Sequence, residues 1–203
     1  MLELNRIHCG DCTGMRGGWA IYQIALSDVV ANGYHEEINW VQSIPSMNEI
    51  DPETFFREYA WCVLNAGMKE QIARKIYNNF LDSGKNPEVI GHLGKRDAIK
   101  KGILLHVKWL SDLKKRANPK SQIDFLESLP WIGPITKYHL ARNIGIDCVK
   151  PDRHLVKLAK NLGYRSPLDL CEEIQQVMPD PKQKLGFIDL VLWRYCNLHG
   201  VPQ

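Results

Sequence analysis

The stretch LPWIGPIT, residues 129–136, decides the fold of this chain. Segments with helical apolar spacing flank it at residues 121–128 and 134–143, which leaves only a tight turn between two helices. Two helices joined in this way form a hairpin whose turn points its backbone N–H groups outward, beside the N-terminus of the second helix. We therefore expect the turn from Trp131 to Ile135 to bind one anion, such as a phosphate.

A second feature, KPDRH at residues 150–154, places Asp152 seventeen residues after Ile135. Pro151 fixes the entry to a helix and is expected to place Asp152 in the first turn. There the helix dipole and the nearby N–H groups favour an ionised carboxylate. An aspartate after proline is also a frequent helix cap, so two interpretations of Asp152 remain, a structural cap and a catalytic carboxylate.

Helix signals dominate the rest of the chain. One apolar stripe predicts a helix over residues 16–32, and it consists of Trp19, Tyr22, Leu26, Val29 and Val30. Two further helices are expected over residues 55–67 and 69–81, separated at Gly67, and a long amphipathic one over residues 96–116.

Proline after a capping residue marks four more helix starts, at Asp51-Pro52, Gly133-Pro134, Ser166-Pro167 and Asp180-Pro181. Ser121 is expected to open a short helix after Asn118-Pro119, in a capping box with Asp124. These segments amount to about nine helices joined by short turns, so the sequence predicts an all-α protein.

The length of 203 residues and the 44% of hydrophobic residues suit one compact folding unit. The N-terminal residues lack the basic-then-apolar layout of a signal peptide, and no apolar run approaches the ~18 residues of a membrane span. We expect an intracellular protein of the cytoplasm or nucleoid, monomeric and without a membrane partner.

Charge is distributed unevenly along the chain. Residues 1–94 hold 7 Lys and Arg against 12 Asp and Glu, a net charge of −5. Residues 95–165 hold 16 against 6, a net charge of +10, and residues 166–203 hold 3 against 5, a net charge of −2. A basic middle block is typical of a protein that binds a polyanion, although solvated lysine faces give the same count.

The hairpin and the downstream PDRH together resemble the helix-hairpin-helix (HhH-GPD) DNA glycosylase superfamily, whose usual hairpin is LPGVGxKTA followed by VDxH. Residues 55–80 and 131–163 are similar to endonuclease III and to 8-oxoguanine glycosylases. The resemblance implies two helical subdomains with a cleft between them. A helical barrel would span about 50–145, with the hairpin at 121–143, and the second subdomain would join about 1–49 to 146–203.

The resemblance also implies a function on double-stranded DNA that contains a damaged or modified base. Such enzymes rotate the base out of the stack. As the base leaves, positive charge develops on the deoxyribose, and a fixed carboxylate at Asp152 would stabilise it and orient the attacking water. No cofactor is implied.

The lysine that gives some members lyase activity is missing. Ile135 stands at its position, and Lys137 lies about 200° around the same helix. The sequence therefore predicts a glycosylase without lyase activity. A base-modifying enzyme, as proposed for glycosylase-like proteins in phage thymine hypermodification, and a DNA-binding module without chemistry remain alternatives.

Further site residues follow from the resemblance. Residues expected at the DNA are Trp131, Gly133, Ile135, Thr136 and Lys137. Trp131 replaces the first hairpin glycine, and its indole is expected either along the DNA backbone or as a plug in the barrel. Residues expected around the extruded base are Asn65, Met68, Phe187, Asp189 and Trp193, for which core packing is the competing interpretation.

Two short pairs invite a metal interpretation. Cys9 and Cys12 near the start and Cys196 and His199 near the end form a ligand set that suits tetrahedral zinc. The iron–sulfur spacing of the endonuclease III branch is absent, and two isolated pairs are a weak pattern. We predict no metal.

Overall fold

Every regular element in residues 17–180 and 182–203, which the computed structural model describes, is helical, so the predicted all-α class is confirmed. The elements are, in order, α1 (Gly17–Ala31), α2 (His35–Ser43), α3 (Pro52–Asn65), α4 (Glu70–Asp82), the short 3₁₀ helix η1 (Pro87–Val89), α5 (Leu93–Lys114), α6 (Pro119–Glu127), α7 (Thr136–Asn143), α8 (Arg153–Asn161), α9 (Pro167–Val177) and α10 (Leu185–His199). Among them only α5, with 22 residues, reaches membrane-spanning length, and its many charged side chains rule it out as a span.

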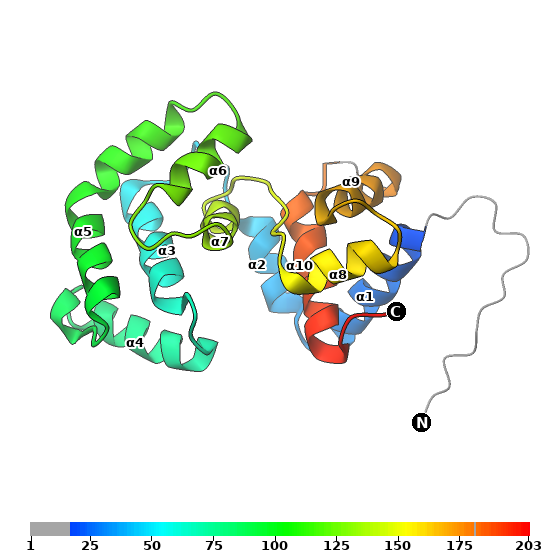
Figure 1. Cartoon of the computed structure of the whole chain (residues 1–203), viewed down its shortest axis with the longest axis horizontal. Coiled ribbons are helices and arrows are strands. Elements are labelled where there is room, and N and C mark those ends of the chain that lie inside the picture. Colours follow the sequence, from blue (N-terminus) through cyan, green and yellow to red (C-terminus); the bar gives the residue numbers. More distant parts are fainter. Residues whose placement is uncertain (1–16, 181) are drawn as a thin grey trace, which may run out of the picture.

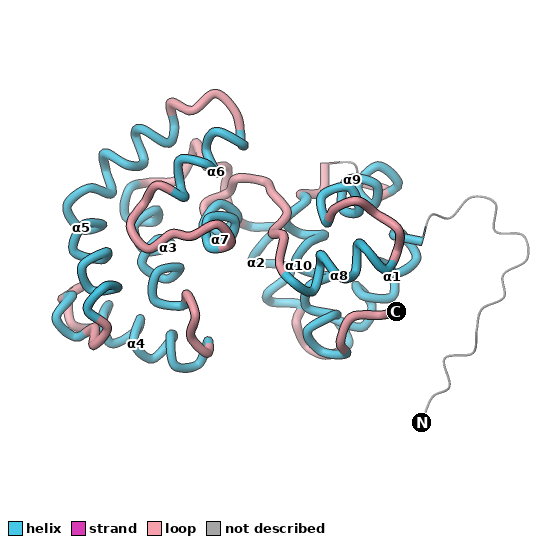
Figure 2. The backbone as a smooth tube through the Cα atoms, viewed as in Figure 1, coloured by secondary structure: helices cyan, strands magenta, loops and turns pink. Residues whose placement is uncertain are grey.

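The helices form two groups (Figure 1), and each group is built around its own hydrophobic cluster. The first cluster is formed by residues between 47 and 148, and it includes the helices from α3 through α7. The second combines residues 22–44 with residues 149–196, so α1 and α2 pack with α8, α9 and α10. Figure 2 shows the loops that connect the two halves of the molecule. The chain passes from one cluster to the other twice, once before α3 and once after α7.

Local side-chain capping starts five of the ten α-helices in the described residues, α3, α5, α6, α8 and α9. Asp51 caps α3 by accepting a hydrogen bond from the Thr54 N–H at 2.8 Å, and Ser166 caps α9 as predicted. The predicted start of α6 at Ser121 is wrong. Asn118 is the cap and Pro119 is the first helical residue. Ser121, at the third helical position, completes a capping box because its side chain accepts a hydrogen bond from the backbone N–H of Asn118.

Three other expectations need correction. Helix α7 begins at Thr136, two residues after Pro134, and α10 begins at Leu185 rather than at Asp180. The side chain of Asp180 instead accepts from the Lys182 N–H at 2.9 Å in a turn, and Pro181 lies outside the described residues. The structure also has ten α-helices in its described part instead of about nine.

The helix that the sequence did not predict is α2, His35–Ser43. Its cap position, Tyr34, makes no side-chain capping bond, so the usual start signal is missing. The helix forms because Ile38 and Val41 are buried in the second cluster. Tertiary packing rather than local propensity therefore stabilises α2.

Tyr59 of α3 holds the hairpin against the first cluster. Its hydroxyl lies 2.8 Å from the carbonyl oxygen of Pro130 and 3.2 Å from that of Ala98. The ring packs on Gly102 of α5, where an added Cβ would lie 2.7 Å from it. A side chain at Gly102 would therefore displace the ring that positions the hairpin.

Candidate functional site

Asp152 is the N-cap of α8, one position before the first turn in which we expected it. Its Oδ1 accepts hydrogen bonds from the N–H groups of His154 at 2.9 Å and Leu155 at 3.0 Å. Its Oδ2 has no hydrogen-bond partner within residues 17–180 and 182–203. The side chain is half-buried rather than buried. One oxygen thus caps the helix while the other remains available to a ligand, so the two interpretations of Asp152 are compatible.

The loop between α7 and α8 has little freedom. Gly145 has a φ of +81°, in the region that favours glycine, and an added Cβ would lie 1.9 Å from the carbonyl oxygen of Pro45. The N–H of Ile146 donates to the carbonyl of Ala141 at 2.9 Å. The contact between Gly145 and Pro45 holds the loop after α7 against the segment that precedes α3. The loop that leads to Asp152 is thereby held in place.

Asp189 on α10 is a candidate pocket residue whose pKa is strongly shifted by its surroundings. It is 1% exposed, and its Oδ2 lies 3.3 Å from Nη1 of Arg142 on α7. Burial raises the pKa of Asp189 to about 7, the Arg142 guanidinium opposes this shift, and the negative charge of Asp152 adds to it. A buried carboxyl group whose pKa is raised by a second carboxylate is a recurring arrangement in acid–base sites.

Three side chains share one face of α7, because residues spaced by four and then three lie in line on a helix. They are Ile135 just before the helix, then His139 and Arg142. Burial lowers the pKa of His139 to about 3, with the charges of Arg142 and Lys150 acting in the same direction, so its imidazole is neutral at neutral pH. No sequence motif singled out His139, although its position one turn after Ile135 was a usable signal.

Trp131 has a left-handed backbone conformation, which glycine adopts most readily. Its φ is +65°, a value that L-residues with a side chain rarely adopt. The indole packs on Gly94 at the start of α5, and its ring lies 5.0 Å from that of His92. With 43% of its surface exposed, Trp131 covers the start of α5 instead of filling the interior of the first cluster.

The other hairpin residues differ in what they leave accessible. Ile135 is 45% exposed, Thr136 is half-buried at the start of α7, and an added Cβ at Gly133 would meet nothing within 4 Å. Lys137 points to α6, where its Nζ lies 2.5 Å from Glu127 and 3.4 Å from Asp124. The charge of Lys137 is therefore neutralised by carboxylates of the chain itself.

The remaining pocket candidates lie in different surroundings. Asn65 and Met68 are half-buried in the turn from α3 to α4, where the Met68 N–H donates to the Asn65 carbonyl at 3.1 Å. Phe187 is buried in the second cluster. Trp193 is half-buried, and the Arg194 guanidinium lies 4.7 Å from the centre of its ring. Of the five candidates, Asp189 is the one whose pKa responds to Asp152.

Only two of the four residues of the metal pattern, Cys196 and His199, lie in the described part of the chain. Cys9 and Cys12 lie outside the described residues. Cys196 is buried, and Nε2 of His199 lies 2.7 Å from Oδ2 of Asp28. Within the part that the structure describes, no three potential ligands lie close enough together to hold a metal ion.

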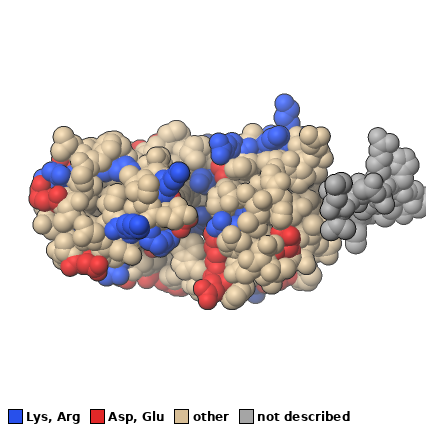
Figure 3. All heavy atoms as spheres, turned by 90° about the horizontal axis from the view of Figure 1, so that it is seen from below, with Lys and Arg blue, Asp and Glu red and all other residues tan. Residues whose placement is uncertain are grey.

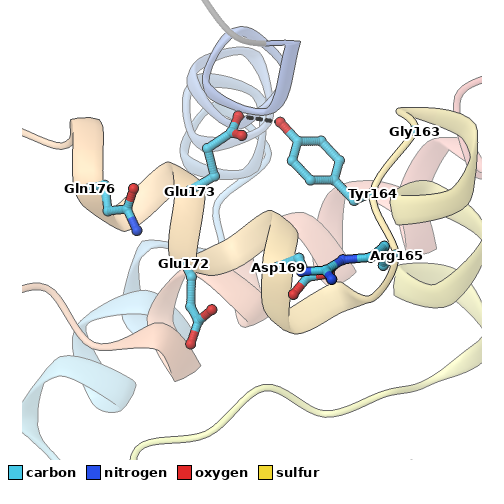
Figure 4. Close-up of a pocket in the computed structure, with 7 residues that line it drawn as sticks. All are labelled: Gly163, Tyr164, Arg165, Asp169, Glu172, Glu173 and Gln176. Atoms are coloured by element: carbon cyan, nitrogen blue, oxygen red, sulfur yellow. Dashed lines mark hydrogen bonds and ion pairs between the residues drawn. The ribbon is translucent and has the colours of Figure 1, made fainter.

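A hollow of about 330 Å³ opens beside α9 (Figure 4). Its lining includes the acidic side chains Asp169, Glu172 and Glu173, and Tyr164 donates a hydrogen bond to Glu173. Asp152 is not part of this lining. Clustered carboxylates repel phosphates, so the hollow is unsuited to DNA.

Neither a protein-family model nor a curated protein matches the sequence. Among solved structures, the Methanocaldococcus jannaschii 8-oxoguanine glycosylase/lyase in complex with a 15mer DNA containing 8-oxoguanine is 21% identical, with a TM-score of 0.61 over 91% of this chain and 100% of that chain. The 8-oxoguanine DNA glycosylase of Thermotoga maritima is 19% identical, with a TM-score of 0.59 over 92% of this chain and 100% of that chain. The chain therefore shares the all-helical fold of these glycosylases, as its hairpin and PDRH stretch predicted.

Proposed function

We propose that this chain is a DNA glycosylase that hydrolyses the N-glycosidic bond of a damaged or modified base in double-stranded DNA. The observation that carries the proposal is the carboxylate of Asp152, whose Oδ1 is held by two backbone N–H groups while its Oδ2 has no partner among the described residues. The fold shared with two 8-oxoguanine glycosylases supports the proposal. At 23.3 kDa, the chain is proposed to act as a monomer.

The reaction places one demand on the protein. The bond between the sugar carbon and the base nitrogen breaks, the base leaves with the electron pair, and positive charge develops on the sugar. In our proposal Oδ2 of Asp152 stabilises this charge and orients a water molecule. The water oxygen bonds to the sugar carbon, one of its protons is released, and the departing base takes up a proton.

The extruded nucleotide would lie against the α7 face that holds Ile135, His139 and Arg142. Ile135 is exposed, so it offers an apolar contact, and His139 is a neutral imidazole that can donate and accept hydrogen bonds. Arg142 is engaged with Asp189 behind them. Rotating a base out of the duplex costs a few kcal/mol, and this cost is smallest for damaged or mismatched bases. Such bases would therefore reach this face more readily than normally paired ones.

We further propose that the chain removes the base without cutting the DNA backbone. A lyase step needs an amine that attacks the sugar carbon, and Ile135 at the expected position has none. Lys137 is turned toward Glu127 and Asp124 on α6. In this respect the chain would differ from the relative named a glycosylase/lyase.

The test is incubation of the purified chain with a panel of lesion-bearing duplexes, each with and without hot alkali. The duplex with 8-oxoguanine comes first, because a relative of the same fold was crystallised with it. Strand cleavage only after alkali supports base removal without lyase activity. Cleavage without alkali contradicts the second proposal, and no cleavage on any duplex contradicts the first.

A further inference from the structure

The folded structure divides the basic block of residues 95–165 into engaged and available cations. Of its 16 Lys and Arg, seven form ion pairs with carboxylates of the chain. Lys95 and Lys114 donate to backbone carbonyls instead, and the Arg116 guanidinium lies 4.9 Å from the centre of the Phe125 ring. Ten of the 16 cations therefore already have partners within the protein.

The six others have no ion pair within the described residues, and they are Lys101, Lys120, Lys150, Arg153, Lys157 and Lys160. Four of these six lie within eleven residues around Asp152. The available positive charge is therefore concentrated next to the candidate catalytic carboxylate rather than at the hairpin, where Lys137 is paired.

Arg153, Lys157 and Lys160 form a row on α8, which we call the α8 cation row. Their spacing of four and then three residues places them on one side of the helix, and all three are exposed. The Arg153 Nε lies 3.5 Å from Nε2 of His154, which neutralises no charge. The opposite side of α8 is buried in the second cluster through Leu155 and Leu158. The row thus cannot turn inward without exposing that apolar side.

Figure 3 shows the distribution of charge on one face of the molecule. Lys and Arg side chains gather near its middle and along its upper edge, whereas acidic side chains lie mainly at the left and lower edges. On this face the positive charge therefore does not form an even solvated coat. Partial segregation of this kind is typical of a surface that binds a polyanion.

We infer that the α8 cation row is a contact surface for the DNA backbone, and that its phosphate contacts set the position of Asp152 against the strand. The inference rests on the proposed function. Asp152 caps the helix that carries the row, so the carboxylate and the backbone positions of the three cations keep fixed places relative to one another. Phosphate contacts fix the register of a protein on DNA. A strand held by the row is thereby held at a constant distance from Oδ2 of Asp152.

The inference assigns different tasks to α8 and to the hairpin. The hairpin turn contributes backbone N–H groups, whose contacts to a phosphate release few counterions. Each cation that neutralises a phosphate instead adds about 0.9 to the slope of log K against log salt concentration. The salt dependence of DNA binding should therefore originate mainly from α8.

The experiment measures binding of the full chain to a fluorescent duplex that contains a stable abasic-site analogue, between about 50 and about 200 mM salt. A triple variant replaces the row, with Arg153→Gln, Lys157→Gln and Lys160→Gln. The matched control carries Lys100→Gln, Lys108→Gln and Lys115→Gln, which removes three cations of the same block that are paired with Glu88 or Asp112. Thermal melting verifies that both variants fold. If the triple variant of the row does not fold, the single variants Lys157→Gln and Lys160→Gln are measured in its place.

The row variant is expected to lower the slope by up to about 2.7, while the control changes it by less than about 1. Equal changes in the two variants overturn the inference but leave the proposed function standing, because the wild-type chain still binds DNA. If the wild-type chain does not bind the duplex at all, both the inference and the proposed function are wrong.

Discussion

The guanidinium of Arg142 on α7 lies 3.3 Å from the carboxylate of Asp189 on α10, and this ion pair joins the two hydrophobic clusters behind the candidate site. Both side chains are nearly enclosed, and each also has one buried polar atom without a partner among the described residues, Nε of Arg142 and Oδ1 of Asp189. A buried pair that is incompletely hydrogen-bonded contributes little net stability. Its main effect is expected on the pH dependence of the stability of the protein.

Asp189→Asn should change the pH dependence of stability. The pKa of Asp189 is raised from 3.8 to about 7, so between these values the folded chain binds more protons than the unfolded chain. Wild-type stability therefore falls, relative to the variant, as the pH rises through this window. The measurement is the difference in Tm between the two proteins from about pH 5 to about pH 8.

His139 shifts stability in the opposite direction with pH, but it is present in both proteins and cancels in the difference. Asp82→Asn, at an exposed position, serves as the control and should leave the Tm difference from the wild type independent of pH. A flat difference for Asp189→Asn as well would mean that the Asp189 pKa is not raised.

Asp152→Asn should separate capping from chemistry. Asparagine caps helices about as well as aspartate, so the Tm should change little, whereas loss of the charge removes most turnover. Asp152→Ala should lose both functions and destabilise the fold by about 1 kcal/mol. Single-turnover base release and thermal melting measure the two effects. If Asp152→Asn retained near wild-type turnover, Asp152 would be only a cap.

Ile135→Lys should introduce reactivity that the wild-type chain lacks. Ile135 is 45% exposed at the start of α7, so a lysine there can reach solvent and an abasic sugar. Borohydride reduction of the resulting Schiff base would crosslink this variant to abasic DNA, with little crosslinking of the wild type. Mass spectrometry of the crosslinked peptide identifies the residue.

Lys137→Gln, which removes a lysine paired with Glu127 and Asp124, is the matched control in the same hairpin and should not change the background crosslinking. Efficient crosslinking of the wild type that disappeared in Lys137→Gln or Lys150→Gln would show that another lysine acts as the nucleophile. The proposed absence of lyase activity would then be wrong.

Trp131→Gly should be more stable than Trp131→Ala, the reverse of the usual order. Both variants lose the packing of the indole on Gly94 and His92. Only glycine adopts a φ of +65° without strain, and the left-handed conformation costs a residue with a side chain about 1 kcal/mol. Urea unfolding of the two variants measures the difference. A more stable alanine variant would show that residue 131 is not held in the left-handed region.

The sequence by itself determined the local features of this protein. Asp51 and Ser166 start their helices through side-chain bonds that reach only three residues along the chain, and the spacing of LPWIGPIT and PDRH indicated the hairpin and Asp152. Such signals can be read because both partners lie in one short window. The wrong start predicted for α6 also lay within such a short window. Asn118 and Ser121 are both good capping residues, and only the folded structure selected Asn118.

Only the tertiary structure decided which distant side chains became partners. Asp147 accepts the N–H groups of Leu185 at 3.1 Å and Gly186 at 2.9 Å, so it caps α10 from 38 residues away. The pairing of Arg142 with Asp189, and that of Lys114 with the carbonyls of Asn48 and Ile50, likewise depend on which helices pack together. Such contacts stabilise the chain after its helices have docked, and they follow no local periodicity, so no pattern in the sequence could indicate them.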